Sequence, residues 1–377
     1  MDPVLRWATD RQPNLISLIR QFVECESPSD SIADVRRFLD LLMASVDGIA
    51  TVRKQNGSVL CKFKLPGHRR KSGQILALGH GDTVWPLGTL RAMKFREAEG
   101  RLWGPGVLDM KSGLAFFIFA MRAIRDLDLP VAKEVIMLVT PDEETGSRAS
   151  KSLIEASAKQ SQAVLVLEPG TGLEGKPKTA RKGIGDYRLS VQGIAAHSGV
   201  DFEKGASAVL ELARQLERIA GFTDLKRGIT VNPGVISGGT RSNVIAAEAQ
   251  AHIDMRVPRM RDAAAIERKF RALKPIDKRC TLTLTGGLNR PPMERSKGIA
   301  ALFQLARREA RTLGIKLEES STGGGSDGNF TAALGIPTLD GLGAVGEGAH
   351  ASHESILIDR MADRVALLAK LVIAISP

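Results

Sequence analysis

The stretch ILALGHGDTVWP, residues 75–86, places a histidine and an aspartate directly after an apolar run. Residues Ile75 to Gly79 are the kind of short, continuous apolar run that forms a buried strand. His80 ends this run, and Asp82 follows two positions later. Because ligands bind at the carboxyl ends of the strands in open α/β sheets, these two polar residues mark a candidate site.

Two further apolar runs lead into acidic residues. The run KEVIMLVTPDEE, residues 133–144, ends on Glu143 and Glu144. The run QAVLVLEPG, residues 162–170, contains Glu168 near its end. Continuous apolar strands of this kind are typical of a sheet that is covered on both faces. We therefore expect three strands of an α/β protein to deliver imidazole and carboxylate groups to one edge of the sheet.

Amphipathic stretches next to these runs predict helices. Near the N-terminus they cover residues 14–27 and 30–46, and Asp30 or Ser31 is available as the N-cap of the second helix. Toward the C-terminus we expect helices at 296–313 and 359–375 and a short strand at 336–340.

The pattern changes after residue 182, where apolar residues alternate with polar ones. Such alternation predicts an antiparallel sheet with helices on one face. The expected strands lie at 185–199, 228–239, 242–258 and 279–287, and the expected helices at 205–220 and 262–273. We therefore expect an α/β catalytic domain in two parts, 1–181 and 291–377, with an α+β domain inserted at 182–290.

Composition narrows the class of protein. The chain of 377 residues is 43% hydrophobic, enough for a large core and long enough for two domains. Its longest apolar runs, such as 114–121, fall far short of the ~20 residues that a membrane span needs. The N-terminus has no apolar targeting segment, so we expect a cytoplasmic protein. Three cysteines far apart in the chain indicate neither a disulfide framework nor a thiolate zinc site.

The net charge of +11 raises the question of nucleic-acid binding. The basic residues are dispersed, however, and only 4% of residues are aromatic, which leaves few side chains for base stacking. We expect no nucleic-acid partner. A basic surface that attracts anionic small molecules explains the charge more simply.

Ligand-type side chains follow the expected strands in a regular order. They are His80, Asp82, Asp109, Glu143, Glu144, Glu168 and His350. Nitrogen and oxygen ligands without sulfur suit zinc or another divalent first-row metal. The set is larger than one tetrahedral ion can use. It is enough for two ions ~3.5–4 Å apart with a carboxylate between them.

Each element of this set also has a purely structural interpretation. His80 alone is more often a packed structural group, and two adjacent glutamates are usually a solvated turn. Asp109 could cap the helix that follows it, and the glycines at 323–325 could be a plain loop. Coincidence of all these features at consecutive strand ends is much less probable than any one of them.

Nine motifs in this order along the chain carry a family resemblance. They are HGDTVWP, GPGVLDMKSG, PDEETGS, LEP, AAHSG, SNVIA, DMRVP, GGGSDGN and GAHASHE. The ordered set resembles the dinuclear-zinc aminoacylase and carboxypeptidase family, which includes glutamate carboxypeptidase, acetylornithine deacetylase and succinyl-diaminopimelate desuccinylase. The resemblance implies a mixed-sheet zinc-peptidase domain with an inserted ferredoxin-like lid that makes the contact of a homodimer.

The resemblance also implies a ligand set for two zinc ions. His80 and Glu168 would hold one ion, Glu144 and His350 the other, and Asp109 would bridge them. His353 remains an alternative to His350, although the family spacing of His and Glu matches His350 with Glu354.

Two residues beside the expected ligands have implied roles. Asp82 would accept the other N–H of His80 and fix its tautomer. Glu143 would be the general base, which takes a proton from the metal-bridging water and hands it to the leaving amine.

Substrate-binding residues follow from the same resemblance. The lid residues Arg256 and Asn243 match positions that bind the substrate carboxylate, and the backbone of Gly324 and Gly325 would approach from the catalytic domain. His197 matches the histidine that stabilises the oxyanion across the dimer. Lys176 and Arg290 stand where glutamate carboxypeptidases carry basic residues that face an acidic side chain.

We expect a zinc-dependent amidohydrolase that releases a C-terminal amino acid, with Glu or Asp favoured, from a peptide or N-acyl conjugate. The substrate is then a small molecule with a free carboxylate. An N-deacylase of a diamino acid is an alternative, although Lys176 and Arg290 would repel a cationic side chain. A third interpretation is a relative that binds a partner without catalysis. It is disfavoured because the sequence contains all the expected metal ligands and the expected base.

Overall fold

The computed structural model describes residues 1–67 and 71–376, and the chain forms two compact units. Unit 1 comprises Met1–Ala180, Arg295–Ser321 and the chain from Ser326 onward. Unit 2 comprises Arg181–Glu294 and Thr322–Gly325. The sequence predicts boundaries at 181/182 and 290/291, so unit 2 extends a few residues further than expected.

The short segment Thr322–Gly325 belongs to unit 2, although the sequence predicts its glycines in the catalytic domain. Hydrogen bonds explain the difference. Lys182 N donates to Thr322 O over 3.0 Å, and the Arg181 guanidinium donates to the carbonyl oxygens of Gly324 and Gly325. These contacts link segments that are far apart in the sequence.

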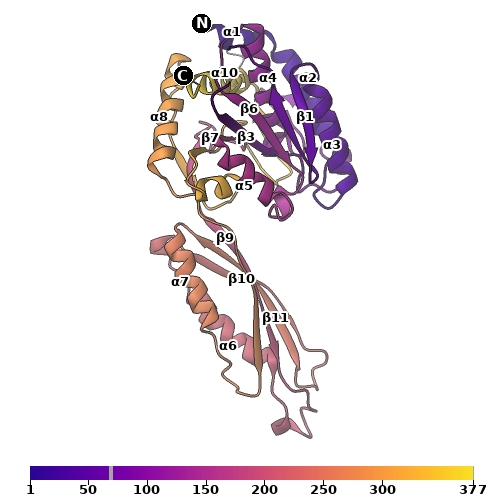
Figure 1. Ribbon diagram of the computed structural model, residues 1–377. Helices are drawn as coiled ribbons and strands as arrows, with labels where there is room; N and C mark the ends of the chain where they lie inside the picture. Colours follow the sequence, from indigo (N-terminus) through magenta and orange to yellow (C-terminus); the bar gives the residue numbers. More distant parts are fainter. Residues whose placement is uncertain (68–70, 377) are drawn as a thin grey trace. The chain divides into compact units, whose positions relative to one another are not determined.

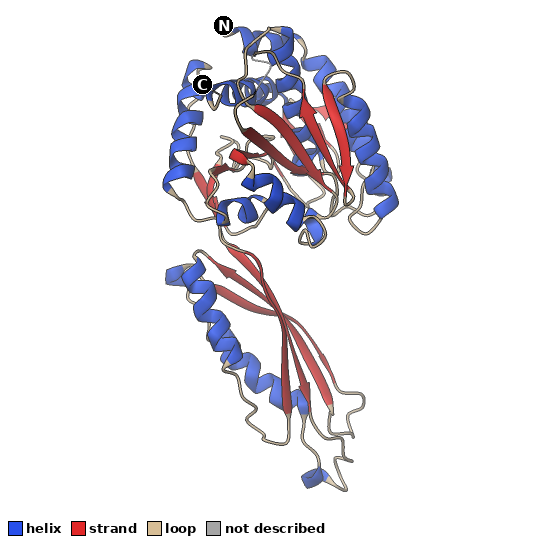
Figure 2. Ribbon diagram, viewed as in Figure 1, coloured by secondary structure: helices blue, strands red, loops and turns tan. Residues whose placement is uncertain are grey.

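Unit 1 is built around a six-stranded mixed sheet in the order β1-β2-β6-β3-β7-β14 (Figures 1 and 2). Its strands are β1 (Ala50–Gln55), β2 (Ser58–Phe63), β3 (Gln74–His80), β6 (Glu134–Thr140), β7 (Ser161–Val166) and β14 (Thr338–Leu339). β6, β3, β7 and β14 run parallel, whereas β1 and β2 are antiparallel to their neighbours. This confirms the predicted α/β domain with a mixed sheet.

Helices and two small sheets complete unit 1. The helices are α1 (Pro3–Asp10), α2 (Gln12–Glu24), α3 (Ile32–Ser45), α4 (Ser112–Asp126), α5 (Lys151–Lys159), α8 (Lys297–Thr312), α9 (Gly328–Ala333) and α10 (Met361–Ala374). The small sheets are β15-β16-β5-β4 and β13-β8, formed by β4 (Arg96–Ala98), β5 (Arg101–Trp103), β8 (Lys178–Arg181), β13 (Ser320–Thr322), β15 (Gly346–Glu347) and β16 (Ser355–Leu357). None of the helices in the described residues is both long and apolar enough for a membrane span.

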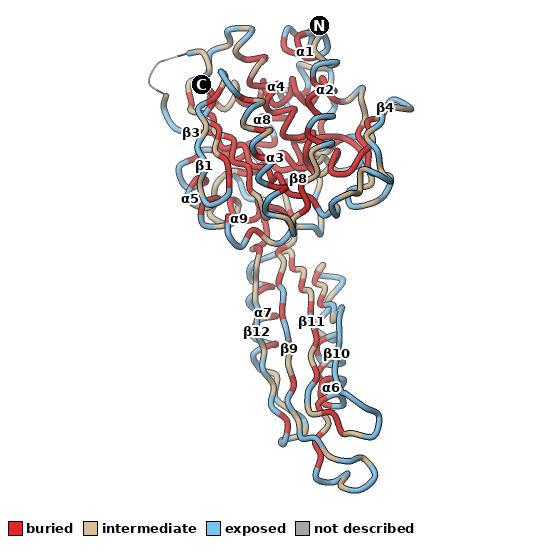
Figure 3. Tube along the Cα trace, turned by 90° about the vertical axis from the view of Figure 1, so that its right-hand side faces the viewer, coloured by how far each residue is buried: buried red, intermediate tan, exposed pale blue. Residues whose placement is uncertain are grey.

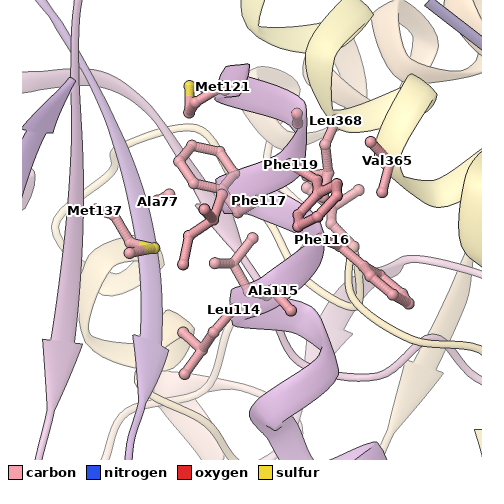
Figure 4. Packing of buried hydrophobic residues seen from close by; sticks show 14 of the residues in the cluster. Ala77, Leu114, Ala115, Phe116, Phe117, Phe119, Met121, Met137, Val365 and Leu368 are labelled. Atoms are coloured by element: carbon pink, nitrogen blue, oxygen red, sulfur yellow. The ribbon is translucent and has the colours of Figure 1, made fainter. Parts of the chain in front are cut away.

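Helix α4 is the centre of the unit 1 core. Its sequence SGLAFFIFAMRAIRD is apolar on nearly all sides, as expected for a helix covered on two faces. Figure 4 shows α4 between the strands that carry Ala77 and Met137 and the helix that carries Val365 and Leu368. Full burial of a Leu, Ile or Phe side chain contributes about 1.5–3 kcal/mol to the stability of the folded state. Because α4 starts three residues after Asp109, this packing also anchors that aspartate.

Unit 2 is a four-stranded antiparallel sheet in the order β10-β11-β9-β12. It follows the chain as β9 (Gly183–Gln192), α6 (Ala208–Ala220), β10 (Thr230–Gly238), β11 (Glu248–Val257), α7 (Met260–Arg271) and β12 (Thr281–Arg290). This βαββαβ succession and strand order are ferredoxin-like. Buried and more exposed residues alternate along β9, as Figure 3 shows for this unit, because one face of the sheet packs on the helices.

Most predicted elements shift at their ends by a few residues. The helix predicted at 262–273 starts earlier, at Met260, and the strand predicted at 336–340 shrinks to β14. Ser31 occupies the N-cap position of α3. Helix α1 and the β1–β2 hairpin were missed, because α1 is short and the hairpin carries mixed polar residues in place of an apolar run.

Candidate active site

The parallel strands β6, β3 and β7 end at one edge of the sheet. His80 is the last residue of β3 and pairs with Thr140, the last residue of β6. Glu143 and Glu144 follow in the short 3-10 helix Glu143–Thr145, and Glu168 follows β7 by two residues. The strand order therefore brings side chains from three separate segments to the same place.

Asp109 stands at the centre of these residues. Its Oδ1 lies 3.3 Å from His80 Nε2, and its Oδ2 lies 3.3 Å from His350 Nε2. Glu168 Oε1 is 3.6 Å from His80 Nε2, and Glu144 Oε1 is 3.5 Å from His350 Nε2. Two groups of three potential ligands thus share Asp109, and within each group the ligand atoms lie within 4.8 Å of one another.

His350, and not His353, is the histidine that approaches Asp109 among the described residues. Its backbone has a φ of +62°, in the left-handed region that non-glycine residues rarely adopt. Such strain persists where the surroundings impose it, often at functional sites. The His350 side chain is 49% exposed whereas that of His80 is 1% exposed, so the cluster opens to solvent on the His350 side.

Asp82 lies behind the cluster and organises two of its segments. His80 Nδ1 is 2.9 Å from the Asp82 carbonyl oxygen and 3.4 Å from its carboxylate, so the carbonyl shares the role that we assigned to the carboxylate alone. The same carboxylate accepts hydrogen bonds from the backbone N–H groups of Glu143 and Glu144, over 3.1 and 3.2 Å. Ser29 Oγ donates to it as well. With Nδ1 engaged, Nε2 of His80 faces Asp109.

The carboxylates of the cluster raise the pKa values of its two histidines. Burial lowers the pKa of His80, but hydrogen bonds to Asp109 and Asp82 raise it well above its ordinary value. Hydrogen bonds to Asp109 and Glu144 raise the pKa of His350 to about 10. Burial raises the pKa of Asp109, but its two histidine partners together hold it well below the ordinary value. Without a bound cation, protons on the two histidines are what balances the carboxylates.

The residues fit a metal site. Glu144 Oε1 is buried, and its contact among the described residues is the long 3.5 Å approach of His350 Nε2, which leaves room for a cation to complete the surroundings of this carboxylate oxygen. All five candidate ligands offer nitrogen or oxygen, which suits zinc and its first-row neighbours.

Comparisons with known proteins agree with this chemistry. The family model described as "Peptidase family M20/M25/M40" matches residues 76–374. The chain belongs to this peptidase family. Carboxypeptidase G2 of Pseudomonas sp. (strain RS-16) is 27% identical over 97% of this chain and 90% of its own length. Acetylornithine deacetylase of Klebsiella pneumoniae (strain 342) is 30% identical over 59% of this chain and 60% of its own length.

Among solved structures, aminopeptidase PepT from Bacillus cereus ATCC 10987 has the same fold. Its TM-score is 0.79 at 21% identity, and the match covers 97% of this chain and 99% of that one. The family model and the match to carboxypeptidase G2 confirm the family resemblance of the ordered motifs.

In this M20/M25/M40 family member, Arg256 lies at one end of the unit 2 sheet. Its Nε donates to both carboxylate oxygens of Asp254 over 2.9 and 3.0 Å, and its Nη1 donates to Gly323 O over 3.4 Å. Unit 2 therefore joins Arg256 to the loop of Gly324 and Gly325, two further residues of the expected carboxylate site.

His197 and Asn243 lie at the opposite end of the unit 2 sheet. Ser198 N donates to Asn243 O over 3.0 Å, which holds the two loops together. His197 follows β9 and Asn243 precedes β11, next to the pair Gln192–Glu248. Arg256 lies eight residues after Glu248 along β11, a distance of about 27 Å at ~3.4 Å per residue. One copy of unit 2 thus separates Asn243 from Arg256, although the family resemblance implies one carboxylate site for both.

Lys176 forms an ion pair, and Arg290 is buried. Lys176 Nζ is 3.2 Å from Glu318 Oε2. Arg290 ends β12 and is 3% exposed. The structure therefore places one of the two expected basic residues in an ion pair and the other in the interior.

Glu354 is a residue of the site whose role sequence reasoning missed. Its side chain is fully buried and accepts hydrogen bonds around Asp109. Burial raises its pKa, against the opposing effect of these N–H donors. The spacing of four residues between His350 and Glu354 was the available signal.

Proposed function

We propose that this chain is a zinc-dependent amidohydrolase that releases a C-terminal amino acid, Glu or Asp, from a peptide or an N-acyl amino acid. The observation that carries the proposal is Asp109, which turns one carboxylate oxygen toward His80 and the other toward His350. A carboxylate in this position suits a pair of divalent ions. Membership of the peptidase family supports the class of reaction.

In this proposal each residue has a definite role. His80 and Glu168 would hold one ion, Glu144 and His350 would hold the other, and Asp109 would be shared. Bound ions would polarise the scissile carbonyl and lower the pKa of water. Glu143 takes the proton of the attacking water on its carboxylate and delivers it to the leaving nitrogen as the amide bond breaks. Asp82 positions the backbone of Glu143 for this task.

The substrate is recognised by its free carboxylate in this proposal. Arg256 and the backbone of Gly324 and Gly325 bind that carboxylate, and Lys176 and Arg290 favour an acidic side chain on the released residue. An acidic substrate would have to compete with Glu318 for Lys176. The preference for Glu or Asp is therefore the part of the proposal that needs a direct measurement.

We also propose that the active form is a homodimer in which His197 stabilises the oxyanion in the partner's site and Asn243 joins it there. Support comes from the length of the unit 2 sheet between Asn243 and Arg256. Val200 and Phe202, in the loop after His197, are 76% and 64% exposed. A contact with the partner subunit would cover these two exposed apolar side chains.

The decisive experiment is hydrolysis of N-acyl amino acids that vary in the released residue, with chelator and with zinc added back. We expect activity that chelator abolishes and zinc restores, with kcat/KM highest for Glu or Asp. Highest activity on an N-acyl diamino acid would favour the deacylase alternative. The similarity to an acetylornithine deacetylase is the reason to include this substrate. Chelator-resistant hydrolysis would contradict the metal mechanism.

A further inference from the structure

We propose that Glu354 is a positioning residue that sets the metal affinity of the site by holding three ligand-bearing loops in one arrangement. The inference rests on the proposed metal-dependent function. Glu354 is not a member of either group of potential ligands in the described residues. It would therefore influence metal binding through the residues to which it is hydrogen-bonded.

Four donors converge on the Glu354 carboxylate. Oε1 accepts from the backbone N–H groups of Leu108 and Asp109, over 2.8 and 3.0 Å. Oε2 accepts from Gly106 N over 2.8 Å and from the indole Nε1 of Trp85 over 2.7 Å. Glu354 is 0% exposed, so water cannot replace any of these donors.

These four bonds reach the segments that carry three of the proposed ligands. Trp85 is five residues after His80 in the same loop, and Asp109 is itself a ligand. His350 is four residues before Glu354. One buried carboxylate therefore ties the positions of these loops to one another, which fits the function of a group that orients metal ligands from behind.

The arrangement requires an anion. Each oxygen faces two N–H donors, so an amide in place of the carboxylate would turn its NH₂ group against two donors in either orientation. Glu354→Gln therefore keeps the size of the side chain and disrupts its hydrogen bonds. No flip of the amide avoids the conflict.

Unit 2 offers a matched control. Glu211 is 1% exposed, and its carboxylate accepts from the backbone N–H groups of Ile276 and Asp277 and from Gln215 Nε2. It lies outside the metal clusters of the described residues. Glu211→Gln thus makes the same chemical change in a buried carboxylate that has a structural role alone.

The test is the zinc affinity of the metal-free chain, measured by competition with a chelating dye, together with the visible spectrum of the cobalt-loaded chain. We expect Glu354→Gln to weaken zinc binding by about 10–100-fold and to change the cobalt spectrum. Glu211→Gln should lower the melting temperature yet leave both readouts as in the wild type. Equal zinc affinity in folded Glu354→Gln and wild type would overturn the inference.

A milder variant covers the case in which Glu354→Gln does not fold. Trp85→Phe removes one donor and leaves the three backbone N–H groups in place. We expect a weaker loss of zinc affinity in the same direction, and an unchanged affinity would overturn the inference. A wild-type chain that retains no zinc would defeat the proposed function itself. If the wild type binds zinc and both variants bind it equally well, only this inference is defeated.

Discussion

Glu143 lies beside the ligand cluster without being one of its members in the described residues. Its backbone N–H is held by Asp82 Oδ1, and its neighbour Glu144 is held by the other oxygen of the same carboxylate. Adjacent glutamates are thus given two different surroundings. Glu144 faces His350, and Glu143 is the residue that we propose as the base.

Glu143→Gln separates these roles. The amide cannot accept the proton of water, so we expect kcat to fall by about 10²–10⁴-fold while both metals are retained. Steady-state kinetics and zinc content per chain measure the two quantities. A variant that loses zinc along with activity would make Glu143 a ligand, and one with near-normal turnover would exclude it as the base.

Lys111 is a second residue with unusual surroundings. It is 1% exposed, its Nζ donates to Cys25 O over 2.7 Å, and burial lowers its pKa to about 8. The unfolded chain keeps this proton up to the ordinary pKa of 10.5. Between these values the unfolded state binds more protons than the folded state, so stability gains as pH rises.

We therefore expect the free energy of unfolding of the wild type, relative to Lys111→Met, to increase between pH 8 and pH 10.5, by up to about 3 kcal/mol. Urea unfolding of the metal-free proteins at several pH values measures it. Other titrating groups cancel in the difference between the two proteins. A difference that stays flat with pH would mean that Lys111 remains charged in the folded state.

At the scale of elements, α4 and the end of β7 fit together through glycine. A Cβ on Gly113, the second residue of α4, would lie 2.0 Å from the carbonyl oxygen of Leu167. Leu167 precedes Glu168, so the approach of this helix decides where that glutamate lies. Only a residue without a side chain permits it.

Gly113→Ala should consequently cost about 1–3 kcal/mol or more of stability and weaken zinc binding, because backbone and not a flexible side chain must move. Gly298, the second residue of α8, is the matched control. A Cβ there would approach Pro337 Cγ to 3.0 Å, with the Pro337 backbone no nearer than 3.8 Å. Gly298→Ala should change stability by less than about 1 kcal/mol and leave zinc affinity unchanged. Melting curves and zinc titrations of both variants decide the matter, and equal effects would refute the argument.

At the scale of the whole molecule, the unit 2 sheet carries two groups of proposed substrate residues at opposite ends. Arg256 is at one end, and His197 and Asn243 are at the other. A long, stiff antiparallel sheet cannot fold back to join its own ends. A second copy of the chain offers the simplest way to use both groups in one reaction.

Mixing two inactive variants tests this arrangement. After subunit exchange between Glu143→Gln and His197→Ala, each mixed dimer would have one site with both residues intact. We expect an equal mixture to recover about a quarter of wild-type activity, because half of the dimers are mixed and each has one working site. No recovery, with exchange verified by mass spectrometry, would place His197 in the site of its own chain.

The α/β class and an inserted α+β domain followed from hydrophobic periodicity, whereas the ferredoxin-like form of the insertion was an expectation from the family resemblance. Continuous apolar runs predicted parallel strands such as β3, and alternating runs predicted the antiparallel strands of unit 2. The candidate ligands after those strands followed as well, because parallel strands end at a common edge. Short or polar elements such as α1 and the β1–β2 hairpin gave too weak a local signal.

The amino-acid sequence by itself determined which chemical groups stand at the ends of the strands, because that depends on neighbouring residues along the chain. Only the tertiary structure decided that Asp109 faces two histidines, that His350 and not His353 approaches it, and that Glu354 holds the Asp109 loop. These features depend on loop conformation and on contacts between residues hundreds of positions apart, for which local sequence has no periodic signal.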